Sequence, residues 1–282
     1  MNQDNENWDL IIQEKSKLFD LRLKEVWRYR DLLQLFVLRN FIAGYKQTIL
    51  GPLWFFIQPI LTTITFTIIF GNLAKISTDG APKFVFYMAG ITIWNYFAVC
   101  LTDVSNVFQS NASIFGKVYF PRLIMPLTTI VSHLMRFFIQ YILFLCFIVY
   151  FYLKGLVHPN LWVIFIPFIL LIMAILSLGL GLILSSLTTK YRDLSMLISF
   201  GIQLFMYASP VIYPVSTVPE KYLWLVQINP LAPIFEYMRF AYLGVGHFNP
   251  LSLIYSFLFS VFILAIGVVI FNKVQKTFMD TV

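Results

Sequence analysis

The sequence predicts an all-α integral membrane protein with six transmembrane helices, an N-terminal amphipathic interface helix, and external re-entrant half-helices between spans five and six. Of its 282 residues, 59% are hydrophobic and only 12% are charged, whereas a soluble domain carries about 25% charged residues. The charge-free runs reach the roughly 20 residues that a helix needs to cross the hydrocarbon core. They are too long and too continuously apolar for strands of a membrane barrel.

Runs without charged residues locate the six spans. They lie within residues 47–74, 84–102, 137–153 with the apolar residues before them, 155–189, 194–219 and 240–272. The two longest runs each include a loop. The chain is therefore divided into a cytoplasmic N-terminal segment with the interface helix, a six-span transmembrane domain and a cytoplasmic tail, over residues 1–48, 49–272 and 273–282.

Positive charge follows membrane topology and does not form a nucleic-acid-binding patch, so no nucleic acid partner is expected. The net charge is +7, and eight of the twenty Lys and Arg residues precede Gln47. With the N-terminus inside, 14 of the twenty fall in cytoplasmic pieces and five in external ones. This bias predicts both termini in the cytoplasm. The cytoplasmic pieces are residues 1–48, 108–125, 188–193 and 273–282.

The stretch YRDLLQLFVLRNFIAGYK, residues 29–46, mixes apolar and basic residues. This pattern is typical of an amphipathic helix that lies in the membrane interface. A soluble helix packed on a partner is the alternative. Pro52 then suits a helix start, and Trp54 suits the aromatic belt at the membrane surface.

The region of residues 209–239 is strongly apolar but contains five prolines, too many for one spanning helix. Two half-helices that dip into the outer leaflet fit better, because irregular backbone at that depth must lie against protein or a water-filled pathway. Glu236 and Arg239 are three residues apart and share a face of the second half-helix. An ordinary external loop with membrane-surface aromatics is the alternative.

The sequence lacks the usual signatures of catalysis and metal binding. The Gly116–Lys117 pair has neither the preceding Gly nor the following Ser or Thr of a phosphate-binding loop. The GLG stretch that starts at Gly179 lies inside a span and indicates helix packing. Cys100 and Cys146 fall in apolar runs without a Cys/His cluster. We therefore expect no enzyme activity, no metal and no cofactor in this chain, so its energy comes from a partner or an ion gradient.

Arg136 is the one basic residue placed within a span by this scheme. Intramembrane cations often line a pathway or hold an anionic group. Alternatively, Arg136 lies near the cytoplasmic end of its helix and snorkels to the surface. The spans offer it no acidic partner, which argues against a proton relay.

Several stretches, in order and over nearly the whole chain, resemble type-2 ABC exporter permeases of the polysaccharide branch, which export O-antigen, capsule and teichoic acid polymers. They are RNFIAGYKQTILGPLWFFIQP before and into span one, NASIFGKVYFPRLIMPL between spans two and three, KYRD between spans four and five, and SPVIYP and INPLAPIFEYMR in the external region. The resemblance implies a homodimer bound to two copies of a separate ABC ATPase, which binds ATP and Mg²⁺. It also implies a polyprenyl-pyrophosphate-linked polysaccharide as substrate, first of all O-antigen, and a location in the bacterial cytoplasmic (inner) membrane, in contact with its lipids.

The resemblance further identifies residues 114–126 as a cytoplasmic segment that couples to the ATPase. Two cations keep it out of the lipid, two aromatic rings offer anchors for a partner, and prolines stiffen it. A plain basic loop is the alternative. The expected coupling residues are Lys117, Tyr119, Phe120, Pro121 and Arg122, together with Lys190, Arg192 and Asp193 from the KYRD stretch.

Three further sets of residues follow from the expected substrate and topology. Aromatic rings that stack on sugars, together with Arg136, are candidates for the pathway, although contact with lipid or packing inside the protein is the favoured role for any single ring. Basic residues near the membrane surface are candidates for the lipid pyrophosphate. The pathway set is Trp94, Tyr96, Phe97, Arg136, Phe137 and Tyr141; the head-group set is Arg28, Arg30, Arg39 and Lys46; the external gate set is Ser209, Pro210, Asn229, Pro230, Glu236 and Arg239.

Two other functions remain open at this point. The chain could be a type-2 ABC exporter of a drug or another small lipophile, which shares the fold, or a gradient-driven carrier or flippase without an ATPase. A neighbouring gene for an ATPase would eliminate the gradient-driven carrier or flippase. Neighbouring glycosyltransferase genes would favour polysaccharide over drug export.

Overall fold

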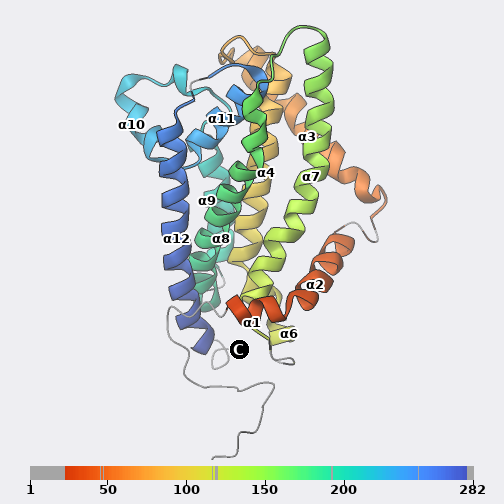
Figure 1. Cartoon of the computed structure of the whole chain (residues 1–282), viewed down its shortest axis with the longest axis vertical. Helices are drawn as coiled ribbons and strands as arrows, with labels where there is room; N and C mark the ends of the chain where they lie inside the picture. Colours follow the sequence, from red (N-terminus) through yellow and green to blue (C-terminus); the bar gives the residue numbers. More distant parts are fainter. Residues whose placement is uncertain are drawn as a thin grey trace, which may run out of the picture.

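The computed structural model describes residues 23–44, 46, 48–115, 117, 120–191, 193–246 and 248–277. These residues form helices and loops and contain no strand, which confirms the all-α prediction. Long helices run side by side, with short helices at both ends of the bundle (Figure 1). The helices are α1 (Leu23–Arg28), α2 (Arg30–Ala43), η1 (Gly51–Leu53), α3 (Trp54–Phe66), η2 (Thr67–Leu73), α4 (Lys83–Ser105), α5 (Val107–Ser110), α6 (Ala112–Phe115), α7 (Ile124–Leu153), η3 (Leu161–Phe165), α8 (Ile166–Lys190), α9 (Leu194–Ala208), η4 (Val215–Thr217), α10 (Glu220–Ile228), α11 (Ala232–Leu243) and α12 (Pro250–Thr277).

The chain is a multi-pass membrane protein. In the described residues, five continuous helical stretches are long and apolar enough to cross a membrane: Gly51–Leu73, Lys83–Ser105, Ile124–Leu153, Leu161–Lys190 and Pro250–Val274. The expected fifth span instead contains α9, which has 15 residues and a length of about 22 Å. That is shorter than the hydrocarbon core of about 30 Å, so the sixth crossing stays a prediction.

The last span lies within the run of residues 240–272, and the predicted loop in this run is confirmed. Phe240, at the start of the run, belongs to α11. This helix ends at Gly244, which adopts the left-handed conformation with φ 72° that commonly terminates helices. A new helix, α12, starts at Pro250, whose fixed φ suits a first helical position. The uncharged run therefore contains the predicted loop, which lies between two helices.

Helix α4 is the centre of the bundle. It packs against α3, α7, α8, α9 and α11. In its most apolar window 78% of the residues are buried, against 17% for α7. An aromatic side chain on α4 is consequently packed against protein, whereas much of α7 faces outward.

Helices α8 and α12 touch along their backbones. A Cβ atom on Gly179 of α8 would lie 2.7 Å from the backbone nitrogen of Leu264 in α12, and one on Gly267 would lie 2.5 Å from the carbonyl oxygen of Gly179. Small residues permit such close approach between membrane helices. The predicted packing role of the GLG stretch is confirmed for Gly179.

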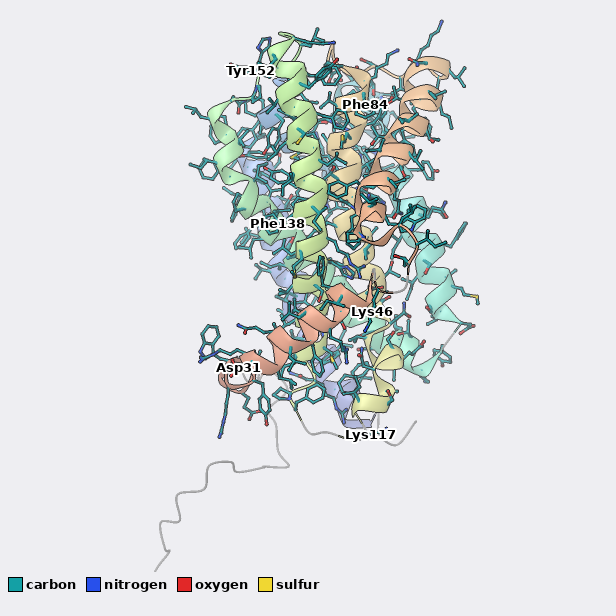
Figure 2. The ribbon with its side chains drawn as sticks, turned by 90° about the vertical axis from the view of Figure 1, so that its right-hand side faces the viewer. Asp31, Lys46, Phe84, Lys117, Phe138 and Tyr152 are labelled. Carbon is teal, nitrogen blue, oxygen red and sulfur yellow. The ribbon has the colours of Figure 1, made fainter. Side chains whose placement is uncertain are left out.

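The two ends of the bundle carry different short helices. The pair α10 and α11 lies at one end, whereas α1, α2 and α6 lie at the other (Figure 1). Helix α2 packs on α7 and slants across its lower part (Figure 2). Two short helices therefore exist where half-helices were expected, and their depth in the membrane stays a prediction.

Candidate functional site

Arg239 on α11 connects the external segments to one another. Its guanidinium donates hydrogen bonds to the carbonyl oxygens of Pro210 at 2.7 Å, Val211 at 2.9 Å and Tyr213 at 3.1 Å. The residue is 1% exposed. A single side chain thus holds the proline-containing loop after α9 against α11, and satisfies carbonyls that this irregular loop leaves without helical partners.

Glu236 completes the arrangement around Arg239. Its Oε1 accepts hydrogen bonds from Arg239 at 3.1 Å and from the backbone nitrogen of Val215 at 3.2 Å. On the other side, the guanidinium carbon lies 3.9 Å from the ring centroid of Phe86 on α4. Burial lowers the pKa of Arg239 to about 10, opposed by the nearby Glu236 carboxylate. The guanidinium is therefore charged at neutral pH, and the pair anchors the external region to the central helix.

Further hydrogen bonds join the other predicted gate residues. The side-chain amide of Asn229 donates to the Ser209 hydroxyl at 2.9 Å, and both residues are buried. The Asn229 oxygen also accepts from the backbone nitrogen of Leu231 at 3.0 Å, across the turn that contains Pro230. The structure thus brings the predicted gate residues together in one region, while their role in gating stays a prediction.

The predicted pathway aromatics lie inside the protein. Trp94, Tyr96, Phe97 and Phe137 are each at most 5% exposed. The Tyr96 and Phe137 rings are 5.5 Å apart, and Phe137 stacks on the partly buried Tyr141, also at 5.5 Å. These contacts agree with the packing alternative for the individual rings. Contact with substrate would require the helices to separate.

Arg136 reaches the corner between α2 and α3. Its guanidinium carbon lies 5.7 Å from the ring centroid of Phe55, and its terminal nitrogen packs against Gly44, where a Cβ atom would collide with it. Its Nε is buried and has no hydrogen-bond partner in the described part of the chain. Both alternatives for Arg136 stay open, because the side chain reaches toward the interface helix and retains an unpaired donor.

One polar pair, between α4 and α7, was not predicted from the sequence. His133 Nε2 and Asp103 Oδ2 are 2.7 Å apart, with His133 5% exposed and the Asp103 side chain 52% exposed. Both residues interrupt apolar runs, which was the available signal. Their 30-residue separation gave no indication of contact until the two helices were placed together.

The predicted coupling segment divides into exposed and buried parts. Lys117 is exposed and lies at the lower end of the molecule (Figure 2), while Pro121 and Arg122 are partly buried. Phe120 is 4% exposed, so its expected role as a ring presented to a partner is wrong for this conformation. Tyr119 lies outside the described residues.

Phe120 belongs to an aromatic cluster within the chain. Its ring centroid lies 5.9 Å from that of Phe36 on α2 and 5.6 Å from that of Phe115 on α6. Phe108 and Phe271 continue the cluster to α12. The cluster therefore joins the coupling segment to the interface helix and to the last helix.

Hydrogen bonds join the helical segments that precede the two stretches predicted to couple to a partner. The Gln109 side chain on α5 donates a 2.7 Å hydrogen bond to the carbonyl of Thr188, near the end of α8. The Thr188 hydroxyl in turn donates to the carbonyl of Ser105 at 2.6 Å. Lys190 and Asp193, just beyond, are exposed, and Arg192 lies outside the described residues.

The four head-group candidates are exposed. Arg30 lies 3.8 Å from Asp31, and Arg39 lies over the Phe36 ring at 4.7 Å and donates to Asn40. Lys46 follows the end of α2 near the base of α3 (Figure 2). With Arg28, these cations are spread along the α1–α2 region rather than gathered into one site.

Comparison with known proteins gives consistent similarities. The family model described as ABC-2 type transporter matches residues 31–243. Two proteins of Klebsiella pneumoniae, both named O-antigen export system permease protein RfbA, are 29% and 30% identical over 255 and 253 residues, which is 89% of this chain and 94% of each relative. A protein of the same name from Myxococcus xanthus is 27% identical over 218 residues, 75% of this chain and 80% of the relative.

Proposed function

The chain belongs to the ABC-2 type transporter family, and from this premise we propose that it is the membrane subunit of a polysaccharide exporter. The substrate is a polysaccharide linked by pyrophosphate to a polyprenyl lipid, first of all O-antigen, and the membrane is the bacterial cytoplasmic membrane. One observation carries the proposal: similarity to O-antigen export permeases extends over 94% of two relatives. A drug exporter or a gradient-driven carrier is the alternative.

The energy in this proposal comes from a separate ATPase that binds ATP and Mg²⁺. The sequence has no phosphate-binding loop of its own. Two copies of the chain form a homodimer and bind two ATPase subunits, since closed two-fold symmetry is the common arrangement of such assemblies. In the membrane, α9 provides a sixth crossing and α10 and α11 enter the outer leaflet, which leaves both termini in the cytoplasm.

Deletion and complementation test the proposed function. Loss of the gene should abolish O-antigen on the cell surface while lipid-linked polymer accumulates inside, and a plasmid copy should restore export only when the ATPase gene is present. Surface O-antigen is measured by antibody on intact cells. Normal export without the ATPase would favour a gradient-driven carrier, and normal O-antigen with altered drug efflux would favour a drug exporter.

A prediction about coupling follows from the hydrogen bond between α5 and α8. Gln109→Leu removes the bond to Thr188, and a lost hydrogen bond costs about 1 kcal/mol. The variant should insert and bind the ATPase, but polymer-stimulated ATP hydrolysis by the purified complex should fall roughly fivefold, a factor that corresponds to this energy. Hydrolysis is measured with the complex in lipid nanodiscs.

Asn111→Leu is the matched control for Gln109→Leu. The Asn111 side chain donates a hydrogen bond to Val107, in its own turn, so the loss of this bond does not separate α5 from α8. Stimulated hydrolysis should stay near the wild-type rate. Equal losses in both variants would show that the segment tolerates no change of polarity, and would refute a specific role for the bond to Thr188.

A further inference from the structure

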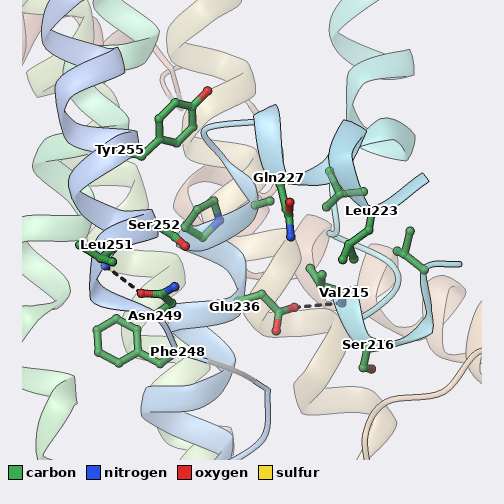
Figure 3. A pocket seen from close by; sticks show the side chains of 14 residues that line it. Val215, Ser216, Leu223, Gln227, Glu236, Phe248, Asn249, Leu251, Ser252 and Tyr255 are labelled. Atoms are coloured by element: carbon green, nitrogen blue, oxygen red, sulfur yellow. Dashed lines mark hydrogen bonds between the residues drawn. The ribbon is translucent and has the colours of Figure 1, made fainter. Parts of the chain in front are cut away.

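A cavity of about 740 Å³ lies between α10, α11 and the start of α12 (Figure 3). It is found at the end of the bundle opposite the coupling segment (Figure 1), the end that the proposed topology places outside. Sites for small ligands usually have volumes of about 300–1,000 Å³. The cavity is thus large enough for a ligand with several functional groups.

One wall of the cavity presents an unsatisfied carboxylate oxygen. Glu236 is 7% exposed, and its Oε1 is occupied by Arg239 and Val215. The described residues provide no hydrogen bond to Oε2, which lies beside Gly246, only 2.8 Å from where a Cβ atom would sit. Because Glu236 lines the cavity, this oxygen is open to accept a hydrogen bond from a ligand.

The charge on this carboxylate is already balanced. Arg239 lies 3.1 Å from Glu236, so the pair carries no net charge. An ammonium or metal ligand would gain little from a neutralised carboxylate and would be repelled by the guanidinium. A neutral ligand that donates hydrogen bonds, such as one with hydroxyl groups, is favoured instead.

Other lining residues match the two kinds of surface that a sugar presents, its hydroxyl groups and its apolar faces. Gln227, Asn249 and Ser252 supply polar groups, and Phe248 and Tyr255 supply rings. The Tyr255 hydroxyl donates to the carbonyl of Ile228 at 2.7 Å, which fixes the orientation of that ring. In Figure 3 the Gln227 amide and the Glu236 carboxylate point toward the same space.

We propose that this cavity binds a short segment of neutral sugar units, which it holds as the polymer emerges on the outer side. The inference rests on the proposed function and adds an external site to it. Glu236 and the amides pair with sugar hydroxyls, and the rings of Phe248 and Tyr255 contact the apolar faces of the sugars. Both rings lie in the cavity wall.

Binding of oligosaccharide fragments tests this site. The full chain with its ATPase is placed in lipid nanodiscs, and the probe is a set of oligosaccharides cut by mild acid from the O-polysaccharide of the producing strain. The variant Gln227→Leu with Ser252→Ala removes two polar groups and should bind about tenfold more weakly. Lys221→Leu, on the same helix but outside the cavity lining, should bind as the wild type does.

A photoreactive residue at position 227 tests occupancy in cells. It should form adducts that react with antibody to the polymer, and these should vanish in a strain that cannot make polymer. Adducts only with phospholipid or with a second copy of this chain would overturn the proposal, as would equal probe binding by the double variant and the wild type. Failure of the gene to restore O-antigen would instead contradict the proposed function.

Discussion

Arg239→Met should leave little folded protein in the membrane. Methionine keeps much of the length of the side chain but donates no hydrogen bond, so three loop carbonyls lose their partner. It also leaves Glu236 as a buried, uncompensated charge. Breaking a buried ion pair on one side costs about 3–5 kcal/mol. The expected result is a large fall in membrane abundance and in the midpoint of thermal unfolding in detergent.

Two further substitutions separate the effect of charge from that of geometry. Arg239→Lys keeps the charge but cannot reproduce the fork that reaches the carbonyls on one side and Glu236 on the other, so its unfolding midpoint should be intermediate. Glu236→Gln retains an oxygen that can accept hydrogen bonds from Val215 and Arg239. Its unfolding midpoint should therefore fall the least of the three. An Arg239→Met midpoint no lower than that of Glu236→Gln would contradict the central role of Arg239.

Arg239 stabilises the external region through contacts that the sequence reveals only in part. From the sequence, Glu236 and Arg239 could be recognised as neighbours on one helical face, because a three-residue spacing places them there. The bonds from Arg239 to Pro210 and Val211 could not be predicted, since they join residues 28 and 29 positions apart. They depend on how the loop after α9 folds back over α11.

Composition and run length predicted most of the membrane helices, because a helix in lipid must be long and apolar. They also indicated a loop within the uncharged run of residues 240–272, and the structure places it between Gly244 and Pro250. Run length alone does not locate such a loop among apolar residues. Its position is set by Gly244, which ends α11, and by Pro250, which starts α12.

Side-chain environments were less predictable than helices. Phe120 lies between two basic residues of the sequence and suggested a ring offered to a partner, yet it is buried against Phe36 and Phe115. The burial arises because α2 and α6 meet around it, and no local pattern encodes that meeting. For Trp94 and Phe97, burial on α4 likewise reflects the central position of that helix, which depends on the arrangement of all its neighbours.

Substitution of the glycines between α8 and α12 should also have a large effect. Leucine at Gly179 or Gly267 would place a side chain where even a Cβ atom lies 2.5–2.9 Å from backbone atoms of the facing helix. Ordinary overpacking costs about 1–3 kcal/mol, and here the contact is with backbone that cannot rotate away. Each variant should be nearly absent from the membrane, or should unfold at a far lower temperature than the wild type.

Gly201→Leu on α9 is the control for these glycine variants. It makes the same change of residue within an apolar helix, but a Cβ atom at Gly201 meets nothing within 4 Å, and leucine has a better helix propensity than glycine. Folded yield, measured by fluorescence-detected size-exclusion chromatography, should therefore stay near that of the wild type. If Gly201→Leu lost as much folded protein as Gly179→Leu and Gly267→Leu, the defect would come from glycine removal in general. If Gly201→Leu folds normally while the other two variants do not, the loss comes from the α8–α12 backbone contact. That contact leaves room only for a hydrogen atom at Gly179 and Gly267.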